Sequence, residues 1–222
     1  MKKTVALIMV LILFCFAVSA CSADKNSFQA AATTKAELPT GFKTAEEIKN
    51  GLTNYEIKIT FFSKDSLTQN ETNIKELRCN QASLVQIDNS IYFMDYDTDT
   101  MYILDEETKT GFKSQSNESL NEYADIFSSY LANWQPYSSL LKSPKSDELI
   151  GRSCKRYDFE AAGTKYSYWI DDETQICLKF NSENGEKKYI MTVDKLEKGK
   201  VSKTGLLDMS EYEIVTIDVF ES

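Results

Sequence analysis

The sequence predicts an α+β protein built on a long antiparallel meander of strands. Three observations predict this class. Apolar and polar residues alternate in several short segments, turn residues recur about every 8–12 positions with no helix between them, and two helix-start signals divide the strands into two runs. This order favours a meander over alternating strands and helices of the parallel type.

The first run of strands follows a short helix. Thr44 and Glu47 have the spacing of a capping box, and Ile48 and Leu52 continue at helical spacing. The period then changes to two from residue 55 to residue 61, which predicts a half-buried strand with one face in water. Further strands are predicted at residues 72–79, 83–88, 91–94 and 101–104, with a shorter extended piece to residue 112.

A helical crossover leads to the second run. Ser119 and Glu122 form a second capping box, and the apolar residues between Leu120 and Trp134 sit at helical spacing up to the break at Pro136. A second short helix is predicted at residues 137–142. The second run of strands is then predicted at residues 154–160, 165–170, 176–181 and 188–196, with a final extended piece at 214–219.

Composition excludes several chemistries. The 222 residues contain no histidine, so a Ser-His-Asp triad, a Cys-His dyad and a His-ligated metal are absent from the chain. The formal net charge is -9, which argues against sequence-independent binding of nucleic acids. A hydrophobic content of 42% supports a folded core. The chain is therefore expected to be no enzyme and to need no cofactor or metal.

The N-terminus resembles a bacterial lipoprotein signal. Lys2 and Lys3 precede 14 apolar residues, Val5–Val18, too few for a comfortable membrane span. Ser19 and Ala20 are small, and Cys21 follows them as in a lipobox. The resemblance implies diacylglycerol transfer to Cys21 and cleavage before it; the alternatives are a retained anchor or a plain secretory signal.

Three segments are predicted from this signal: a signal peptide at 1–20, the acylated Cys21 with a flexible tether at 21–41, and a folded domain at 42–222. Cleavage would remove two lysines and no acid, leaving 23 basic and 34 acidic residues and a charge of -11. Acyl chains on Cys21 would anchor this acidic chain to the extracytoplasmic face of a bacterial membrane. The tether residues from Ser22 to Glu37, as a flexible chain, have a mean reach of roughly 20–25 Å.

A family resemblance rests on the order of these elements and on weak motifs in the second run. The motifs are GRSCKRYDF at 151–159, YWIDDET at 168–174, LK at 178–179 and the tail around Ser210–Ile214. Over roughly residues 44–217 the chain is similar to the outer-membrane lipoprotein carrier (LolA/LolB-like) superfamily. The resemblance implies a curved antiparallel half-barrel of about 10–11 strands, with helices over a concave face that holds acyl chains or serves as an interaction platform.

The alternation of apolar and polar residues along the strands predicts which side chains lie on that concave face. Together with the helix before Pro136, it predicts these cavity-lining candidates: Tyr55, Ile57, Ile59, Phe61, Tyr157, Phe159, Tyr166, Tyr168, Ile170, Leu178, Phe127 and Trp134. Ile176 and Phe180 alternate in step with Leu178 and are predicted to lie on the same face. Alternation is the same for a cavity wall and for a filled core, so both interpretations stay open.

Two acidic segments are interpreted as turns. Asp95–Asp99 with Glu106 superficially matches a calcium loop, but Thr100 stands where that loop needs Gly and the segment joins two strands. Asp171–Glu173 are adjacent on one turn and cannot flank a glycosidic bond from both sides. The first segment is predicted to be an exposed hairpin turn, with calcium binding as the minor alternative, and the second is predicted to be a turn without a catalytic role.

Cys154 and Cys177 are predicted to be free thiols. By period two, Cys154 and Cys177 point outward, and the strand between them separates them by about 9–10 Å, beyond the roughly 7 Å limit of a disulfide. The leading function is then a membrane-anchored lipoprotein that binds a lipid or acyl chain. The alternative is a sensing or protein-interaction module with a filled core.

Overall fold

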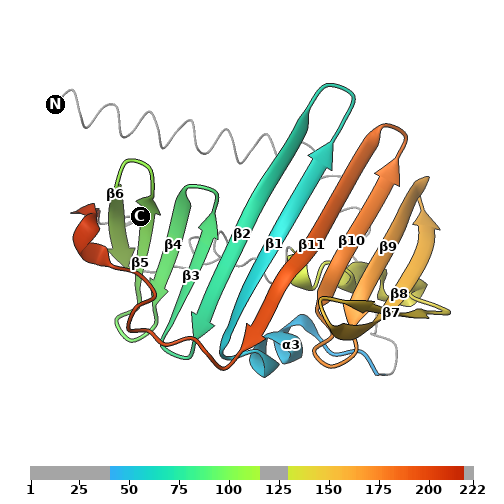
Figure 1. The fold of residues 1–222 in the computed structure, drawn as a ribbon, viewed down its shortest axis with the longest axis horizontal. Helices are drawn as coiled ribbons and strands as arrows, with labels where there is room; N and C mark the ends of the chain where they lie inside the picture. Colours follow the sequence, from blue (N-terminus) through green and yellow to red (C-terminus); the bar gives the residue numbers. More distant parts are fainter. Residues whose placement is uncertain (1–40, 116–129, 218–222) are drawn as a thin grey trace. The chain divides into compact units, whose positions relative to one another are not determined.

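The computed structural model describes residues 41–115 and 130–217, drawn in colour in Figure 1. All of them belong to one compact unit, Leu38–Ser222. Most of these residues form one large, open sheet of 12 strands, so the predicted α+β fold with a curved antiparallel half-barrel is confirmed. The predictions for residues 1–40, including Cys21, lie outside the described residues, as does most of the predicted helix before Pro136.

The strand order across the sheet is β12-β6-β5-β4-β3-β2-β1-β11-β10-β9-β8-β7. The two runs of the sequence therefore form the two halves of the sheet, and they meet where β1 pairs with β11. All pairs are antiparallel except β12 with β6. The strands are β1 (Tyr55–Lys64), β2 (Gln69–Cys79), β3 (Ala82–Ile87), β4 (Ser90–Asp95), β5 (Thr100–Asp105), β6 (Thr110–Gln115), β7 (Lys145–Leu149), β8 (Arg152–Ala161), β9 (Thr164–Asp171), β10 (Cys177–Asn184), β11 (Lys187–Lys198) and β12 (Glu213–Thr216).

Two strands differ most from the prediction. β7 was not predicted, because Lys145–Leu149 is almost entirely polar and is exposed except for its last residue. It forms because it continues the antiparallel pairing at the edge of β8. β2 begins at Gln69, three residues before the predicted start, because its polar N-terminal end follows the register of β1 across their hairpin.

The described helices are short. In α3 (Ala45–Gly51) the predicted capping box is confirmed: the Glu47 amide donates to Thr44 Oγ1 at 3.1 Å, and the Thr44 amide donates to the Glu47 carboxylate at 2.7 Å. The short helix predicted at 137–142 is a 3-10 helix, η2 (Gln135–Leu140). Among the described helices, none has the length and apolar character needed to cross a membrane.

The inner face of the sheet is the side that carries Ile57 and Ile59 on β1. Cross-strand pairing places Val193 and Met191 of β11 on the same side. These side chains form a buried inner cluster with Ile48 of α3 and with residues before and after η2, so α3 and η2 pack over this face. Cys154 and Trp169 also belong to this cluster, although their place in the alternation of β8 and β9 is that of the outer face. The buried members of the inner cluster are Ile48, Leu52, Tyr55, Ile57, Ile59, Ile74, Val85, Leu131, Ala132, Trp134, Leu141, Cys154, Tyr157, Tyr168, Trp169, Ile170, Ile176, Cys177, Leu178, Phe180, Met191 and Val193.

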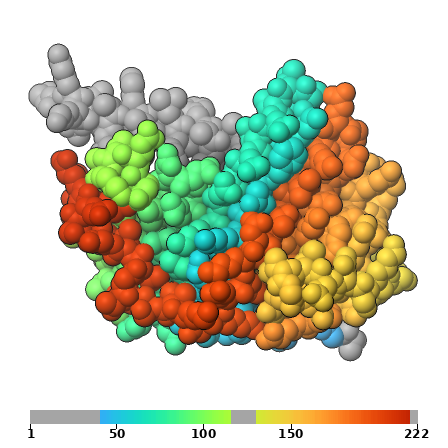
Figure 2. All heavy atoms as spheres, viewed as in Figure 1, coloured from blue at the N-terminus to red at the C-terminus, as the bar shows by residue number. Residues whose placement is uncertain are grey.

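The solvated outer face predicted for residues 55–61 is confirmed on β1, where Lys58 is exposed, but the outer face of β2–β5 is covered. On β2–β5, Leu77, Leu84, Phe93 and Tyr102 stand directly opposite one another on the outer face. They belong to a second cluster, which residues 199–212 cover with Leu206 and other apolar side chains. We call residues 199–212 the strap. It leads from the end of β11, through the 3-10 turn η3 (Met209–Glu211), to β12 at the sheet edge (Figures 1 and 2).

Ion pairs attach the strap to the turns of the first run. Lys203 Nζ lies 2.7 Å from an Asp95 oxygen and 2.8 Å from an Asp97 oxygen. The calcium-like segment is therefore a β4–β5 hairpin turn, as predicted, and the cation bound there is an ammonium of the chain itself. Among the described residues, no group of three or more Cys, Asp or Glu side chains is arranged to hold a metal ion.

Substitution of Gly111 should test how tightly β5 and β6 pack. A Cβ at Gly111 would lie 2.5 Å from the Ile103 carbonyl oxygen and 2.5 Å from Leu104 Cδ2, and the backbone contact cannot relax cheaply. Gly111→Ala is expected to lower the free energy of unfolding by about 2 kcal/mol in urea titrations. The matched control is Gly51→Ala in α3, where nothing lies within 4 Å and a gain of up to about 1 kcal/mol is expected. Equal stability of the two variants would contradict this account.

Candidate ligand-binding face

The structure brings the described candidate residues together on one cluster. Those on β8 and β9 stand directly opposite one another on the inner face, Tyr157 with Tyr168 and Phe159 with Tyr166, and β11 and β10 connect this face to the candidates on β1. Phe61, Phe159 and Tyr166 are partly buried against the cluster, and the other described candidates are buried within it. Phe127 lies outside the described residues. Whether the candidates bind a ligand stays a prediction.

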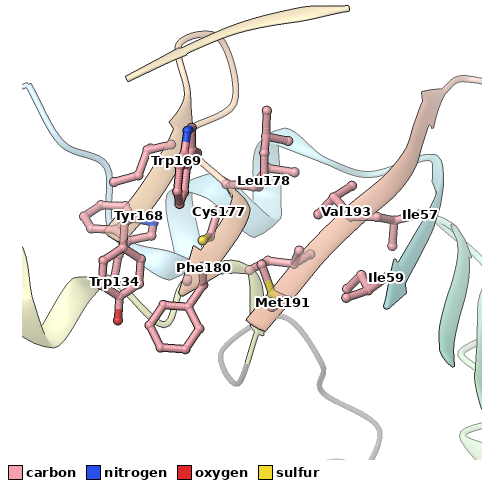
Figure 3. Close-up of a cluster of buried hydrophobic side chains, with 14 of the residues drawn as sticks. Ile57, Ile59, Trp134, Tyr168, Trp169, Cys177, Leu178, Phe180, Met191 and Val193 are labelled. Atoms are coloured by element: carbon pink, nitrogen blue, oxygen red, sulfur yellow. The ribbon is translucent and has the colours of Figure 1, made fainter. Parts of the chain in front are cut away.

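Five rings form the part of this face that is richest in aromatic side chains. We call Tyr137, Phe159, Tyr166, Tyr168 and Phe180 the aromatic cluster. The Phe159 and Tyr166 rings stack with centroids 5.1 Å apart, Tyr137 lies 5.0 Å from Tyr166, and Tyr168 lies 4.8 Å from Phe180. Figure 3 shows Tyr168 and Phe180 near Trp134 and Met191. Contributions come from β8, β9, β10 and η2, so the cluster spans the space between sheet and helix.

Exposure on this face changes along the strands. On β1, Ile57 and Ile59 are buried, but Phe61, two residues nearer the β1–β2 hairpin, is only half-buried. On β9, Tyr168 is buried and Tyr166 is half-buried. Phe61 also meets two rings, Tyr130 at 5.7 Å and the exposed Tyr189 at 6.4 Å. The inner face is thus packed near α3 and accessible toward the hairpin ends of the strands.

The hydroxyl groups of Tyr137 and Tyr168 in the aromatic cluster stay uncharged. Burial, followed by the hydrogen bond to Tyr166, raises the pKa of Tyr137 above its ordinary value. Burial likewise raises the pKa of Tyr168 well above that value. The cluster therefore presents neutral, mainly apolar ring surface at physiological pH, which suits alkyl chains better than charged ligands.

Two cavities are lined by described residues elsewhere. One of about 250 Å³ lies between the outer face and the strap, lined in part by Leu84, Ile91 and Leu206. The other, about 180 Å³, lies between α3 and the turn after β9. Neither is lined by any of the residues predicted for a cavity. On the inner face, the half-buried rings Phe61, Phe159 and Tyr166 are the candidates that keep part of their surface exposed.

Sequence reasoning missed several members of this face. Tyr137 follows Pro136 in a 3-10 helix, and no periodic signal marks it. Phe42 precedes α3 and packs 4.9 Å from the Trp134 ring. Tyr189, Met191 and Val193 do alternate along β11, and that period could have identified them.

A bulge explains one error about the cysteines. Cys177 and Cys154 were both predicted to point outward, and both are fully buried. The register of β10 with β9 shifts between Cys177 and Lys179, so Cys177 stands opposite Ile170, on the inner face. Leu178 lies within this bulge and is buried. Strict alternation of side chains, carried through the bulge, therefore assigns Cys177 to the wrong face of the sheet.

The Cys154 side chain lies on the outer face of the sheet, as predicted, but it is buried there. It stands between Asp171 of β9 and Asp147 of β7 on the outer face. Burial, and next the negative charge of Asp147, raises the pKa of Cys154 to about 11. All three described cysteines, including Cys79, are free.

The turn after β9 is an anchor for its surroundings. The Asp171 carboxylate is 1% exposed and accepts from Arg152 at 2.8 and 2.9 Å and from Thr174 Oγ1 at 2.6 Å. Glu173 continues the network to Lys198 of β11 at 2.5 Å. The motif WIDDET thus ties three strands together, which is a structural role.

Gln175 extends this anchor to the segments that pack on the inner face. Its side chain accepts from the Lys43 amide at 2.6 Å and donates to the Gly41 carbonyl at 2.8 Å. Its carbonyl accepts from Trp134 Nε1 at 3.1 Å. The turn therefore fixes the chain before α3 and the chain before η2 against the sheet.

Asp171→Asn should show how much this turn contributes to the free energy of unfolding. Burial alone would raise the pKa of Asp171, but the bonds from Arg152 and Thr174 outweigh it and the pKa lies below its ordinary value. A lowered pKa stabilises the fold above the unfolded-state pKa near 4, and that stabilisation is lost as pH falls through the folded-state pKa. The substitution should cost about 3 kcal/mol at pH 7 and progressively less below pH 4, measured by urea unfolding.

The neighbouring Asp172→Asn is the matched control. The Asp172 side chain is exposed and lies 3.9 Å from Lys155 Nζ, and the substitution leaves its backbone hydrogen bond to Ser153 in place. Its substitution should change the unfolding free energy by less than about 0.5 kcal/mol. If Asp171→Asn lowers the unfolding free energy by no more than the control, or by an amount that does not vary with pH, then Asp171 does not stabilise the fold as we expect.

Thiol titration should report the buried state of the cysteines. In the chain from residue 22 to residue 222, Cys79, Cys154 and Cys177 should be inert to a thiol reagent at pH 8, because all three are buried and the pKa values of Cys154 and Cys177 are raised. All three should react after denaturation. Rapid native reaction of Cys154 or Cys177, or a single thiol after denaturation, would contradict the structure.

Comparisons with known proteins gave matches among solved structures only. Neither a protein-family model nor a curated protein matches this chain. The lipoprotein LppX of Mycobacterium tuberculosis is 13% identical, with a TM-score of 0.38 over 71% of this chain and 93% of LppX. PNGF-II is 12% identical, with a TM-score of 0.35 over 74% of this chain, which spans only 31% of PNGF-II.

A third structure bears on the family resemblance. A LolA superfamily protein of Nitrosomonas europaea is 7% identical, with a TM-score of 0.34 over 75% of this chain and 99% of that one. Scores of this size carry no argument about ligand or activity, so the fold class rests on the sheet itself. The superfamily that the sequence resembles is represented among the structures similar to this chain.

Proposed function

We propose that this protein is a lipoprotein, anchored through Cys21 on the extracytoplasmic face of a bacterial membrane, that binds a lipid or acyl chain on its inner face without catalysis. One observation carries the proposal: half-buried rings, Phe61, Tyr137, Phe159 and Tyr166, continue an otherwise buried apolar cluster toward the hairpin ends. Neutral ring surface of this kind is a favourable contact for an alkyl chain.

The mechanism would be burial of the chain against these rings. If about 200 Å² of apolar surface leaves water, the hydrophobic effect contributes about 5 kcal/mol before the cost of association. Specificity would come from the length and shape of the bound alkyl chain, since no member of the aromatic cluster is charged. The buried part near α3 would act as a fixed wall behind the ligand.

Binding fits the described side chains better than catalysis does. Catalytic cysteines need a lowered pKa, whereas burial raises the pKa of Cys154 and of Cys177. Asp171 is held by Arg152 and Thr174 and is unavailable as a general base. The proposal therefore assigns no reaction and no cofactor to the chain.

Uptake of a fluorescent fatty acid should test the proposal. The chain from residue 22 to residue 222, which lacks the acylation site, is expected to bind the probe, and native mass spectrometry should show co-purified lipid. Tyr166→Ser is expected to weaken binding by about tenfold, because the substitution removes a ring that contacts Tyr137 and Phe159.

Tyr102→Ser is the matched control for ring loss. Tyr102 is a partly buried tyrosine of β5, but it lies on the outer face in the second cluster. Probe binding should be unchanged in this variant. Absence of uptake and of co-purified lipid, or equal loss in both variants, would reject the inner face as a lipid site.

That negative result would favour the alternative, a sensing or protein-interaction module. The observation behind it is that most of the described candidates are buried in the inner cluster, as in a filled core. Such a module would present its surface to a protein partner, and Tyr166→Ser would then act on stability alone.

A further inference from the structure

The cavity of about 250 Å³ under the strap has no part in the function proposed above. Its floor is the outer face of β2, β3 and β4, and its roof is the strap, which Figure 2 shows in red across the first run of strands. Leu84 and Ile91 of the floor and Leu206 of the roof are buried. These side chains give the cavity an apolar interior, on the face of the sheet opposite to the aromatic cluster.

One cation beside this interior has no carboxylate in contact with it. Lys75 of β2 lies on the cavity floor, directly opposite Gln86 of β3, and both side chains are half-buried. Among the residues that the structure describes, no carboxylate lies within 4 Å of the Lys75 ammonium. Glu56 attracts Lys75 at longer range, but Glu56 already accepts from Lys195 at 2.9 Å and lies 3.9 Å from Lys58.

Three lysines also stand directly opposite one another on this face. Lys58 of β1 faces Lys75 on one side and Lys195 of β11 on the other. Like charges that face each other across strands destabilise a sheet. An anion beside Lys75, at the cavity end of this row, would relieve the repulsion. The acids around the row, none of them in contact with Lys75, are Glu56, Asp194 and Glu197.

Three acids line the cavity where the strap meets the β5–β6 turn: Glu106, Asp208 and Glu211. Lys109 Nζ lies 2.6 Å from Glu106 and 3.3 Å from Glu211. Asp208 accepts from the Ser210 amide at 2.9 Å at the start of η3. The β5–β6 turn is three strand spacings from β2, or about 14 Å across the sheet. Each acid therefore already has a donor of the chain, and the cation at the β2 end is the lining charge left to pair with a ligand.

We infer that this cavity is a second ligand site, which takes a small amphipathic anion made of one aromatic ring and a short carboxylate arm. The carboxylate would pair with Lys75 and accept from the Gln86 amide. The ring would lie against Leu84, Ile91 and Leu206. An apolar cavity of about 150 Å³ holds a benzene molecule, so about 250 Å³ leaves room for a ring and a short charged arm. The inference does not rest on ligand binding by the inner face.

Titration with phenylacetate, followed by two-dimensional NMR of the chain from residue 22 to residue 222, should test this site. We expect saturable shifts at the amides of Leu84, Ile91 and Leu206, with a dissociation constant on the order of 1 mM for a ligand of this size. Phenylacetamide, which has the ring but no charge, should bind about fivefold more weakly. Acetate, which has the charge but no ring, should cause no shifts at the same concentrations.

Lys75→Gln is the deciding variant, and Lys58→Gln is its matched control. Both substitutions remove one lysine from the same row, but Lys58 does not line the cavity. Lys75→Gln should bind phenylacetate as weakly as phenylacetamide, whereas Lys58→Gln should keep the preference for the acid. The inference is overturned if phenylacetate causes no saturable shifts around the cavity, if it binds no better than phenylacetamide or the cation phenethylamine, or if both variants lose the preference equally.

Tyr166→Ser separates this site from the inner face. Tyr166 lies on β9, in the second run of strands and on the inner face. The variant is expected to take up less fluorescent fatty acid and to show unchanged phenylacetate shifts, so the two sites can fail independently. Loss of phenylacetate binding in Tyr166→Ser would place the ligand on the inner face and reject the site under the strap.

Discussion

The pairing of β1 with β11 is the constraint on which the rest of the structure depends. It joins two halves of the sheet that come from distant parts of the sequence, with Tyr55 opposite Lys198 at one end and Lys64 opposite Lys188 at the other. The register continues Ile59 of the first half into Val193 of the second, so both halves share one inner face. Without it, the rings of β8–β10 and the aliphatic residues of β1 would belong to separate clusters.

The two halves bury their surfaces in different ways. In the second half, α3 and η2 cover the inner face, and the turn around Asp171 and Gln175 fixes the segments that lead to them. In the first half, the strap covers the outer face and is attached through Lys203. One sheet therefore supports clusters on opposite sides, and the half-buried rings of the inner face keep part of their surface exposed.

Local signals in the sequence predicted the elements that local chemistry decides. The capping box at Thr44 and the alternation from Tyr55 to Phe61 need only neighbouring residues, and both were predicted correctly. β7 could not be predicted, because a polar segment becomes an edge strand only when a partner such as β8 is present. Cys177 was assigned to the wrong face because a bulge depends on the facing strand. The outer cluster was missed because alternation within one strand does not reveal that the strap returns to cover β2–β5.

The composition of the two sheet edges has a consequence for crowding. An open sheet ends in unpaired backbone groups, which can pair with another copy and aggregate. Here one edge is β7, five residues that include Lys145, Asp147 and Glu148, and the other is β12, only four residues long. Under the anchoring that we propose through Cys21, copies would be concentrated in two dimensions and would meet edge to edge often. Short, charged edges favour copies that remain separate at such surface densities.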